Sequence, residues 1–316
     1  MDLSFAKNIV CSCFHTDDPG RPPRNPLGVF RKFIVMRMKG VRSLREMTRL
    51  LDVDQRLKRI CLLKTSEAAY SRSVLSRFTR KVGEDNLNKI IDEKVVNLLK
   101  NSQVKEVDVV LDVSFIKAWS IRDPIDNQTG YSDKDARVGR AGRSYALGYK
   151  LHLSIDHKLM LPLSSVFASA NQNEKKHSLT ILGKAKQVLK GSGAKIRSLI
   201  ADSQYSDGKI RMAVDKTVIP YPANQKRGFK EVLRVDKKFR SFGPEEDRKE
   251  YRKRPTIEAV NSFLKTQYGM AMNKVRGLGQ LASYALFSIL CLVLNREAAQ
   301  NIGRADKAVS PTFFNT

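Results

Sequence analysis

Three acidic residues, far apart in the sequence, have surroundings typical of ligands for divalent cations. Asp112 ends the apolar run Val107–Asp112, Asp202 follows the run Ile196–Ala201, and Glu258 lies near the start of a predicted helix. Acids at the carboxyl ends of strands gather at one edge of a sheet. Mg²⁺ prefers carboxylate oxygens, and two such ions can activate an oxygen nucleophile and stabilise a leaving oxygen in phosphoryl transfer. The alternative for each Asp alone is a turn or helix-capping residue.

The surroundings of Glu258 strengthen the metal-site hypothesis. Tyr251, Arg254, Glu258 and Lys265 occur as Y-x2-R-x3-E-x6-K. Seven residues separate Glu258 and Lys265, so both lie on one face of the helix that follows Pro255. Proline suits the first helical turn, which places Tyr251 and Arg254 in the preceding turn or loop. A carboxylate beside cationic and phenolic groups suits a metal bound next to DNA phosphates, and a helix face with ordinary ion pairs is the alternative.

The charge of the chain narrows its partners. Its 316 residues include 58 Lys and Arg against 32 Asp and Glu, a net charge of +26. Such a charge fits a polyanionic partner, either nucleic acid or an anionic membrane surface.

The four scattered cysteines do not form a disulfide framework and indicate a reducing compartment. The apolar stretch Leu281–Leu294 is too short to span a bilayer, so we expect a cytoplasmic, nucleoid-associated protein.

Periodicity divides the chain into four parts. We expect a mobile N-terminal arm over 1–29, a helical DNA-binding domain over 30–104, a catalytic α/β domain over 105–298 and a C-terminal tail over 299–316. The helical domain begins with a basic segment, for which a solvated helix face is the alternative to DNA contact. In the catalytic domain, strands are predicted over 107–112, 144–155, 159–168, 196–201 and 218–221, and helices over 177–189, 207–214, 256–268 and 279–295. Loops are expected over 121–143 and 225–254, the second tracking DNA.

With these acids and the spacing from Tyr251 to Lys265, the sequence resembles a known family, the DDE insertion-sequence transposases. The resemblance is in particular to the insertion sequence 4 group, which has a Y-R-E-K signature. Beyond that signature, the matching stretches are LDVSFIKA at 111–118, GYKLHL at 148–153, IADSQY at 200–205 and KVRG at 274–277. The resemblance covers residues 107–295. A less specific one, over 30–83, is to the helical N-terminal domain of many such transposases.

The resemblance implies a ribonuclease-H-like mixed sheet flanked by helices and preceded by a small helical domain. It also implies an enzyme that nicks transposon ends and joins the 3′ hydroxyl to target DNA. Asp112, Asp202 and Glu258 would bind two Mg²⁺ ions, for which Mn²⁺ can substitute. The residues Tyr251, Arg254 and Lys265 would contact double-stranded DNA, with the protein acting as a homodimer on that DNA.

Two departures from the family pattern and two rival functions accompany the resemblance. Ser114 stands where the family often has Thr, and Gln204 stands where it often has Gly. The rivals are a ribonuclease-H-like nuclease without strand transfer, and an inactive or domesticated transposase that only binds DNA.

For three further features of the sequence, we expect a structural role first. Trp119, the only tryptophan, is predicted to be a core or loop anchor, with stacking on a displaced base as the alternative. His152 is expected to be structural. The acids of the loop 121–143, including Asp123 and Asp133, are expected to be solvated.

Overall fold

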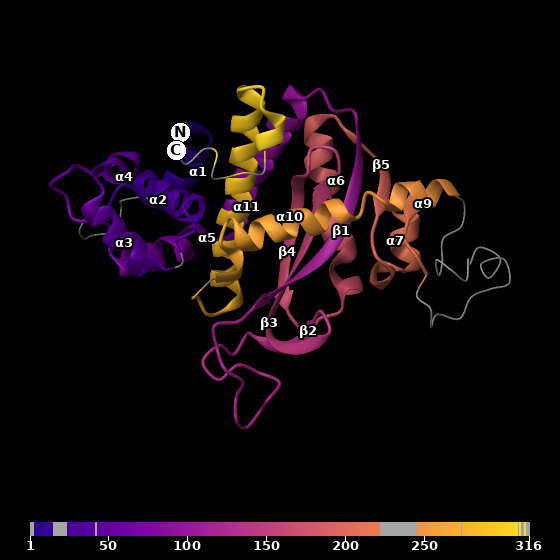
Figure 1. Ribbon diagram of the computed structural model, residues 1–316, viewed down its shortest axis with the longest axis horizontal. Helices are drawn as coiled ribbons and strands as arrows, with labels where there is room; N and C mark the ends of the chain where they lie inside the picture. The colour runs from indigo at the N-terminus through magenta and orange to yellow at the C-terminus, as the bar shows by residue number, and fades with distance from the viewer. Residues whose placement is uncertain are drawn as a thin grey trace. The chain divides into compact units, whose positions relative to one another are not determined.

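The computed structural model of the chain describes residues 3–14, 24–41, 43–221, 245–272 and 274–308, together with residues 310 and 313 (Figure 1). Two compact units make up the chain. The first contains Met1–Lys94, Ile116–Val138 and Ser262–Thr316, and the second contains Val95–Phe115 and Gly139–Asn261.

A six-stranded mixed sheet is the centre of the α/β region. Its strands are β1 (Glu106–Lys117), β2 (Arg137–Ala141), β3 (Ser144–Asp156), β4 (Leu161–Ser169), β5 (Lys195–Ile200) and β6 (Thr217–Val218). Their order is β2-β3-β1-β5-β6, with β4 also paired to β3. Strands β1, β5 and β6 run parallel, whereas β3 and β4 are antiparallel. Figure 1 shows β1, β3 and β4 side by side, and the helix α6 (Glu174–Ser192) packs against β3, β4 and β5.

Short helices connect and follow the later strands. These are the 3₁₀ helix η1 (Ser203–Tyr205), α7 (Gly208–Met212), α9 (Glu245–Tyr251) and α10 (Pro255–Thr266). Each predicted strand and helix of this region is present, with boundaries shifted by a few residues. The expectation of a loop over 225–254 is wrong where it meets α9, and residues 222–244 lie outside the described part of the chain.

Two strand predictions need correction. The apolar run was predicted to end at Asp112, but β1 continues to Lys117. The reason is that β3 flanks β1 on the side away from β5, so pairing continues after β5 has ended. The predicted loop 121–143 contains β2, where Gly139 leaves no room for a side chain because an added Cβ would lie 2.1 Å from the Ala170 carbonyl oxygen.

The side chains of this segment also differ from expectation. Asp123 and Asp133, expected to be solvated, are buried at 8% and 3% exposure. Trp119, expected to be a core or loop anchor, does not belong to the core, since it is 50% exposed and follows β1 outside any helix or strand. Asp133 accepts a hydrogen bond from Gly277, a partner more than 140 residues away that local sequence does not reveal.

The first unit consists mainly of helices, and stacked aromatic side chains lie in its core. The helices are α1 (Ser4–Ser12), α2 (Pro26–Met38), α3 (Leu44–Val53), α4 (Gln55–Ile60), most of α5 (Arg72–Asn101), α11 (Leu278–Asn301) and the 3₁₀ helices η2 (Met270–Met272) and η3 (Ala305–Lys307). Phe33 of α2 stacks on Phe287 of α11 at 4.8 Å between ring centroids and meets Tyr284 edge-on at 5.6 Å. Gly83, at φ 71°, bends α5 where a side chain would be strained.

Helix α11 has apolar residues on every side, as expected of a helix that is buried on nearly every side. It is longer than the predicted 279–295, and its length and composition meet the requirements for a membrane span. However, 83% of its most apolar 18-residue window is buried within the protein, as expected of a core helix. A buried cation accompanies it: Arg37 donates to the Gly269 carbonyl oxygen at 3.1 Å and lies 5.2 Å from the Tyr284 ring centroid.

The compact units do not follow the domain boundaries predicted from the sequence. Residues 4–12 and 26–29, within the predicted mobile arm 1–29, are helical, and Ala6 and Val10 are buried. Residues 15–23 lie outside the described part. Helix α11, assigned from the sequence to the catalytic domain, packs against α2 in the first unit. Apolar periodicity identifies a buried helix without identifying the helix that covers it.

Phe287→Ala should destabilise the protein by about 3–5 kcal/mol, because it removes a fully buried ring that contacts two other aromatic rings. Chemical denaturation followed by circular dichroism measures this change. The control Val53→Ala, at a side chain 78% exposed, should change stability by less than about 0.5 kcal/mol. Equal effects of the two substitutions would contradict the assignment of the core.

Candidate active site

The register of β1 and β5 brings two of the predicted acids to matching positions. Val110 and Ile200 are the last residues of this parallel ladder that face each other. Asp112 lies two residues after Val110, and Asp202 lies two residues after Ile200. Asp202 also accepts a hydrogen bond from the Gln204 main-chain N–H at 3.0 Å, which fixes its side chain at the start of η1.

The third acid joins Asp112 through a shared cation. Arg254, in the turn before α10, donates from Nη1 to Glu258 Oε1 at 2.6 Å and from Nη2 to Asp112 Oδ1 at 3.3 Å. Asn261, one helical turn after Glu258, donates to the other oxygen of Asp112 at 3.4 Å. Asp112 is buried, whereas the Glu258 side chain is 53% exposed. The site therefore reaches from the sheet interior to solvent.

The electrostatics of the acids reflect their burial. Burial raises the pKa of Asp112 to about 6; Arg254 opposes this shift, and the carboxylates of Asp202 and Glu258 reinforce it. Burial likewise raises the pKa of Asp202, again opposed by Arg254. Burial alone would lower the pKa of Arg254, but Asp112, Tyr251 and Asp202 outweigh that effect and raise it. The acids together thus favour a positive charge among them.

Two tyrosines lie close to the same acids. Tyr251 is the last residue of α9, so its placement in a turn or loop needs correction, whereas Arg254 lies in the predicted turn. Burial raises the pKa of the Tyr251 phenol, Arg254 lowers it, and Asp202 raises it further. Tyr205, at the end of η1, is fully buried, and its hydroxyl has no hydrogen-bond partner within the described part of the chain. Tyr205 belongs to the stretch 200–205 that resembles the family, but the resemblance implies no role for it.

A network around Asp108 was missed by sequence reasoning. The buried Asp108 carboxylate accepts hydrogen bonds from Arg197 Nε at 2.8 Å, Ser198 Oγ at 2.7 Å and Lys253 Nζ at 2.8 Å. Burial alone would raise the pKa of Asp108, but these donors hold it well below its usual range. The available signal was the spacing of four residues between Asp108 and Asp112, which puts both on one face of a strand.

This network fixes the turn that carries Arg254. Consecutive residues of the turn, Lys253 and Arg254, bind Asp108 and Asp112 respectively. A third attachment is made by His157, whose Nδ1 lies 2.9 Å from the Thr256 hydroxyl in the first turn of α10. The position of Glu258 on α10 therefore follows from contacts made to the sheet and to the β3–β4 turn.

The donor set fits a hard divalent cation in its chemistry, and Arg254 shows that a cationic group fits between Asp112 and Glu258. No group of three His, Cys, Asp or Glu among the described residues is arranged to hold a metal ion as it stands. Lys265 lies in the last turn of α10, in the first unit.

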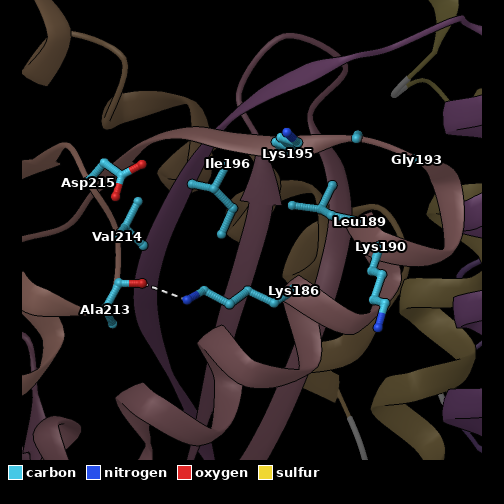
Figure 2. A pocket seen from close by; sticks show the side chains of 10 residues that line it. Lys186, Leu189, Lys190, Gly193, Lys195, Ile196, Ala213, Val214 and Asp215 are labelled. Carbon is cyan, nitrogen blue, oxygen red and sulfur yellow. Dashed lines mark hydrogen bonds between the residues drawn. The ribbon is translucent and has the colours of Figure 1, made fainter.

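Two other features of the second unit lie apart from this arrangement. His152, expected to be structural, is fully buried in β3 and packs on His177 at 4.8 Å between ring centroids. A cavity of about 420 Å³ lies at the start of β5, the opposite end from Asp202, and Figure 2 shows Lys186 reaching across it to the Ala213 carbonyl oxygen. It contains none of the predicted site residues.

Comparison with known proteins identifies the family. The sequence profile of the transposase DDE domain matches residues 103–295, more than half of the chain. The chain belongs to the DDE transposase family. A second profile, described as a transposase domain (DUF772), matches residues 1–81, in the helical region. Members of the DDE family are nucleases and strand-transfer enzymes that act with divalent metal ions. The mixed sheet flanked by helices, with further helices before it in the chain, confirms the predicted α/β fold class.

Solved structures of transposases also show a distant likeness. The piggyBac transposase in its synaptic complex with hairpin DNA has 11% identity and a TM-score of 0.44, over 98% of this chain and 75% of that one. The Mos1 transposase paired-end complex has 10% identity and a TM-score of 0.24, over 81% and 82%. Both scores are below 0.5, so the family assignment rests on the sequence profile. A search of curated proteins finds no significant match.

Asp108→Asn should destabilise this transposase by about 1.5–3 kcal/mol at neutral pH, because it removes the charge that Arg197 and Lys253 bind. The pKa of Asp108 is lower in the folded protein than in the unfolded chain, where it is about 3.9. The stabilisation is therefore present above about pH 4 and is lost as the pH falls further. Denaturant unfolding between pH 3 and pH 7 measures it.

The matched control is Asp306→Asn, since Asp306 pairs with Arg304 on the surface and solvent screens that pair. We expect the stability difference between wild type and Asp108→Asn to shrink in acid, with little effect of the control at any pH. A difference that does not change with pH would contradict an ionised Asp108.

Proposed function

We propose that the chain is an active DNA transposase that nicks the ends of its element and joins the 3′ hydroxyl to target DNA. Asp112, Asp202 and Glu258 are proposed to hold two Mg²⁺ ions, with Mn²⁺ as a substitute. The observation that supports this most is the shared cation: Asp112 and Glu258 bind one guanidinium. Asp202 lies two residues after Ile200, as Asp112 lies two residues after its partner Val110.

When bound, the metal ions would supply an activated oxygen nucleophile and a counter-charge for the leaving oxygen. The chain's own residues make the site ready for a cation. Burial makes the charged form of Asp112 costly without a positive neighbour. Arg254 supplies that neighbour in the metal-free protein. On metal binding we expect Arg254 to release the acids and turn to a DNA phosphate, for which its planar donors are well suited.

The chain is proposed to belong to the insertion sequence 4 group, on the basis of its Y-R-E-K spacing. Tyr251 and Lys265, with Arg254, are proposed to contact DNA near the scissile phosphate. The departure at Gln204 is compatible with the site, because only its main-chain N–H binds Asp202. Ser114 keeps the hydroxyl of the usual Thr and is buried in β1.

Double-stranded DNA, both element ends and target, is the proposed partner. The net charge of +26 supports binding that weakens steeply with salt. The helical region 30–104 is proposed to contribute to this binding. We propose a homodimer on DNA, because the two ends of the element must be brought together. We propose a cytoplasmic, nucleoid-associated location, because the chromosome is the DNA that the protein would bind.

Asp112→Asn and Glu258→Gln should each reduce Mg²⁺-dependent cleavage of a duplex carrying the element's end by at least about 100-fold. DNA affinity should change little, because most of it comes from the basic surface. Gel analysis of cleavage and joined products, together with fluorescence anisotropy of a labelled duplex, measures both. Glu246→Gln, at an exposed position in α9, is the control and should cleave as the wild type does.

Wild-type rates in either acid variant would refute the site. Cleavage by the wild type without joined products would favour a nuclease that lacks strand transfer. Salt-sensitive binding with no cleavage by the wild type would favour an inactive, DNA-binding transposase.

Arg254→Ala should lower the stability of the metal-free protein by about 1–3 kcal/mol, since Asp112 loses its buried counter-charge while Glu258 is half exposed. The same variant should gain more thermal stability from added Mg²⁺ than the wild type, because no guanidinium competes for the acids. Thermal unfolding with EDTA and with Mg²⁺ measures both effects. Arg252→Ala, at an exposed position in the same turn, serves as control. An Mg²⁺ response that is unchanged or smaller in Arg254→Ala would mean that Arg254 does not hold the cation position.

A further inference from the structure

The segment that follows β1 presents an aromatic and apolar surface to solvent. Trp119 is 50% exposed, and Ile121, Tyr131 and Ile125 are 70%, 60% and 98% exposed. Ile121 and Tyr131 are held next to each other by a main-chain hydrogen bond of 2.9 Å. Large apolar side chains exposed next to one another, as Ile121 and Tyr131 are, are typical of a binding surface rather than of a folded core.

Basic residues flank the Trp119 ring. Lys274 Nζ lies 5.2 Å from the ring centroid, within the range of a cation–π interaction. Arg276 Nε donates to the Trp119 carbonyl oxygen at 3.5 Å. Both cations come from the short segment before α11, more than 150 residues away in sequence from Trp119. The exposed ring is thus placed beside two positive charges.

The ring is held on a fixed support. Asp133 accepts a hydrogen bond from the Gly277 main-chain N–H at 3.1 Å, and Asp135 accepts one from Leu278 N–H at 2.9 Å. These carboxylates bind the segment to the N-terminal end of α11, where negative charge is stabilised. Within the segment, Ser120 Oγ accepts from the Ser132 N–H at 3.1 Å. Little ordering of this surface would be needed on binding.

We propose that Trp119 is a stacking platform for an unpaired base of DNA, with Lys274 and Arg276 at the adjoining phosphates. An exposed indole offers a flat face to any base, and neighbouring cations match the charged backbone attached to that base. A base inside a duplex has its faces covered by its neighbours, so the platform should favour single strands. DNA as the partner rests on the proposed function, whereas the stacking itself does not require cleavage.

The first test uses the fluorescence of Trp119, which reports on this position alone because the chain has no other tryptophan. The full-length protein is titrated in EDTA with an oligothymidine of about 15 nucleotides, and with a blunt duplex of the same length. Anisotropy of labelled DNA measures how much is bound. We expect strong quenching at saturation by the single strand and weaker quenching by the duplex. Unquenched emission at saturation, or no binding of the single strand, would overturn the proposal.

The second test uses variants and the anisotropy signal. Trp119→Ala should weaken single-strand binding by about 10-fold with a smaller effect on the duplex, and Trp119→Phe should retain most of the affinity. Lys274→Ala should reduce the slope of log affinity against log salt by about one. Met212→Ala, at a side chain 81% exposed in the second unit, is the matched control and should bind as the wild type does.

Equal single-strand affinity of Trp119→Ala and the wild type would overturn the proposal. Because these measurements are made without metal, their result is independent of catalysis. Stacking without cleavage in Mg²⁺ would contradict the proposed function alone, and cleavage without stacking would contradict this inference alone.

Discussion

Two carboxylates buried on strand β1 are neutralised by two consecutive cations, and these pairings shape the candidate site. Strand β1 carries two buried carboxylates on one face, Asp108 and Asp112. Their partners, Lys253 and Arg254, are adjacent in the turn before α10. These two pairings hold the turn against β1, and Glu258 follows one helical turn later on α10, where it binds the same Arg254. The fold thus uses the cost of burying charge to bring a distant helix to the sheet.

The same pairings connect the structure to the chemistry of the DDE family. Asp112 and Glu258 share a guanidinium, so a positive charge is already accommodated at the place where we propose that metal ions bind. The raised pKa of Asp112 has burial as its main cause, and a divalent cation would relieve that cost more fully than a single guanidinium does. Arg254 is therefore best understood as the counter-charge of a metal-free site. Asp108 and its partners, which do not touch the acids, hold this counter-charge in place.

Much of this arrangement could be predicted from local sequence. Two apolar runs followed by acids predicted the strands, and the spacing from Tyr251 to Lys265 predicted α10 and its turn, because these signals depend on neighbouring residues. Features that depend on distant partners were missed. The extension of β1 beyond Asp112 requires β3, and the burial of Asp133 requires the N-terminal end of α11. The hydrogen bond from Asn261 to Asp112 joins residues 149 positions apart, so local sequence does not predict it. The spacing of three residues between Glu258 and Asn261 shows only that these two residues share one face of α10.

The most direct test of the account is a crystal structure of the protein grown with Mn²⁺, whose anomalous scattering locates the ion without ambiguity. The account predicts anomalous density at the carboxylates of Asp112, Asp202 and Glu258, with the Arg254 guanidinium displaced from Asp112 and Glu258. Crystals at saturating Mn²⁺ that show no ion at these acids, with Arg254 still bound to both Asp112 and Glu258, would contradict it.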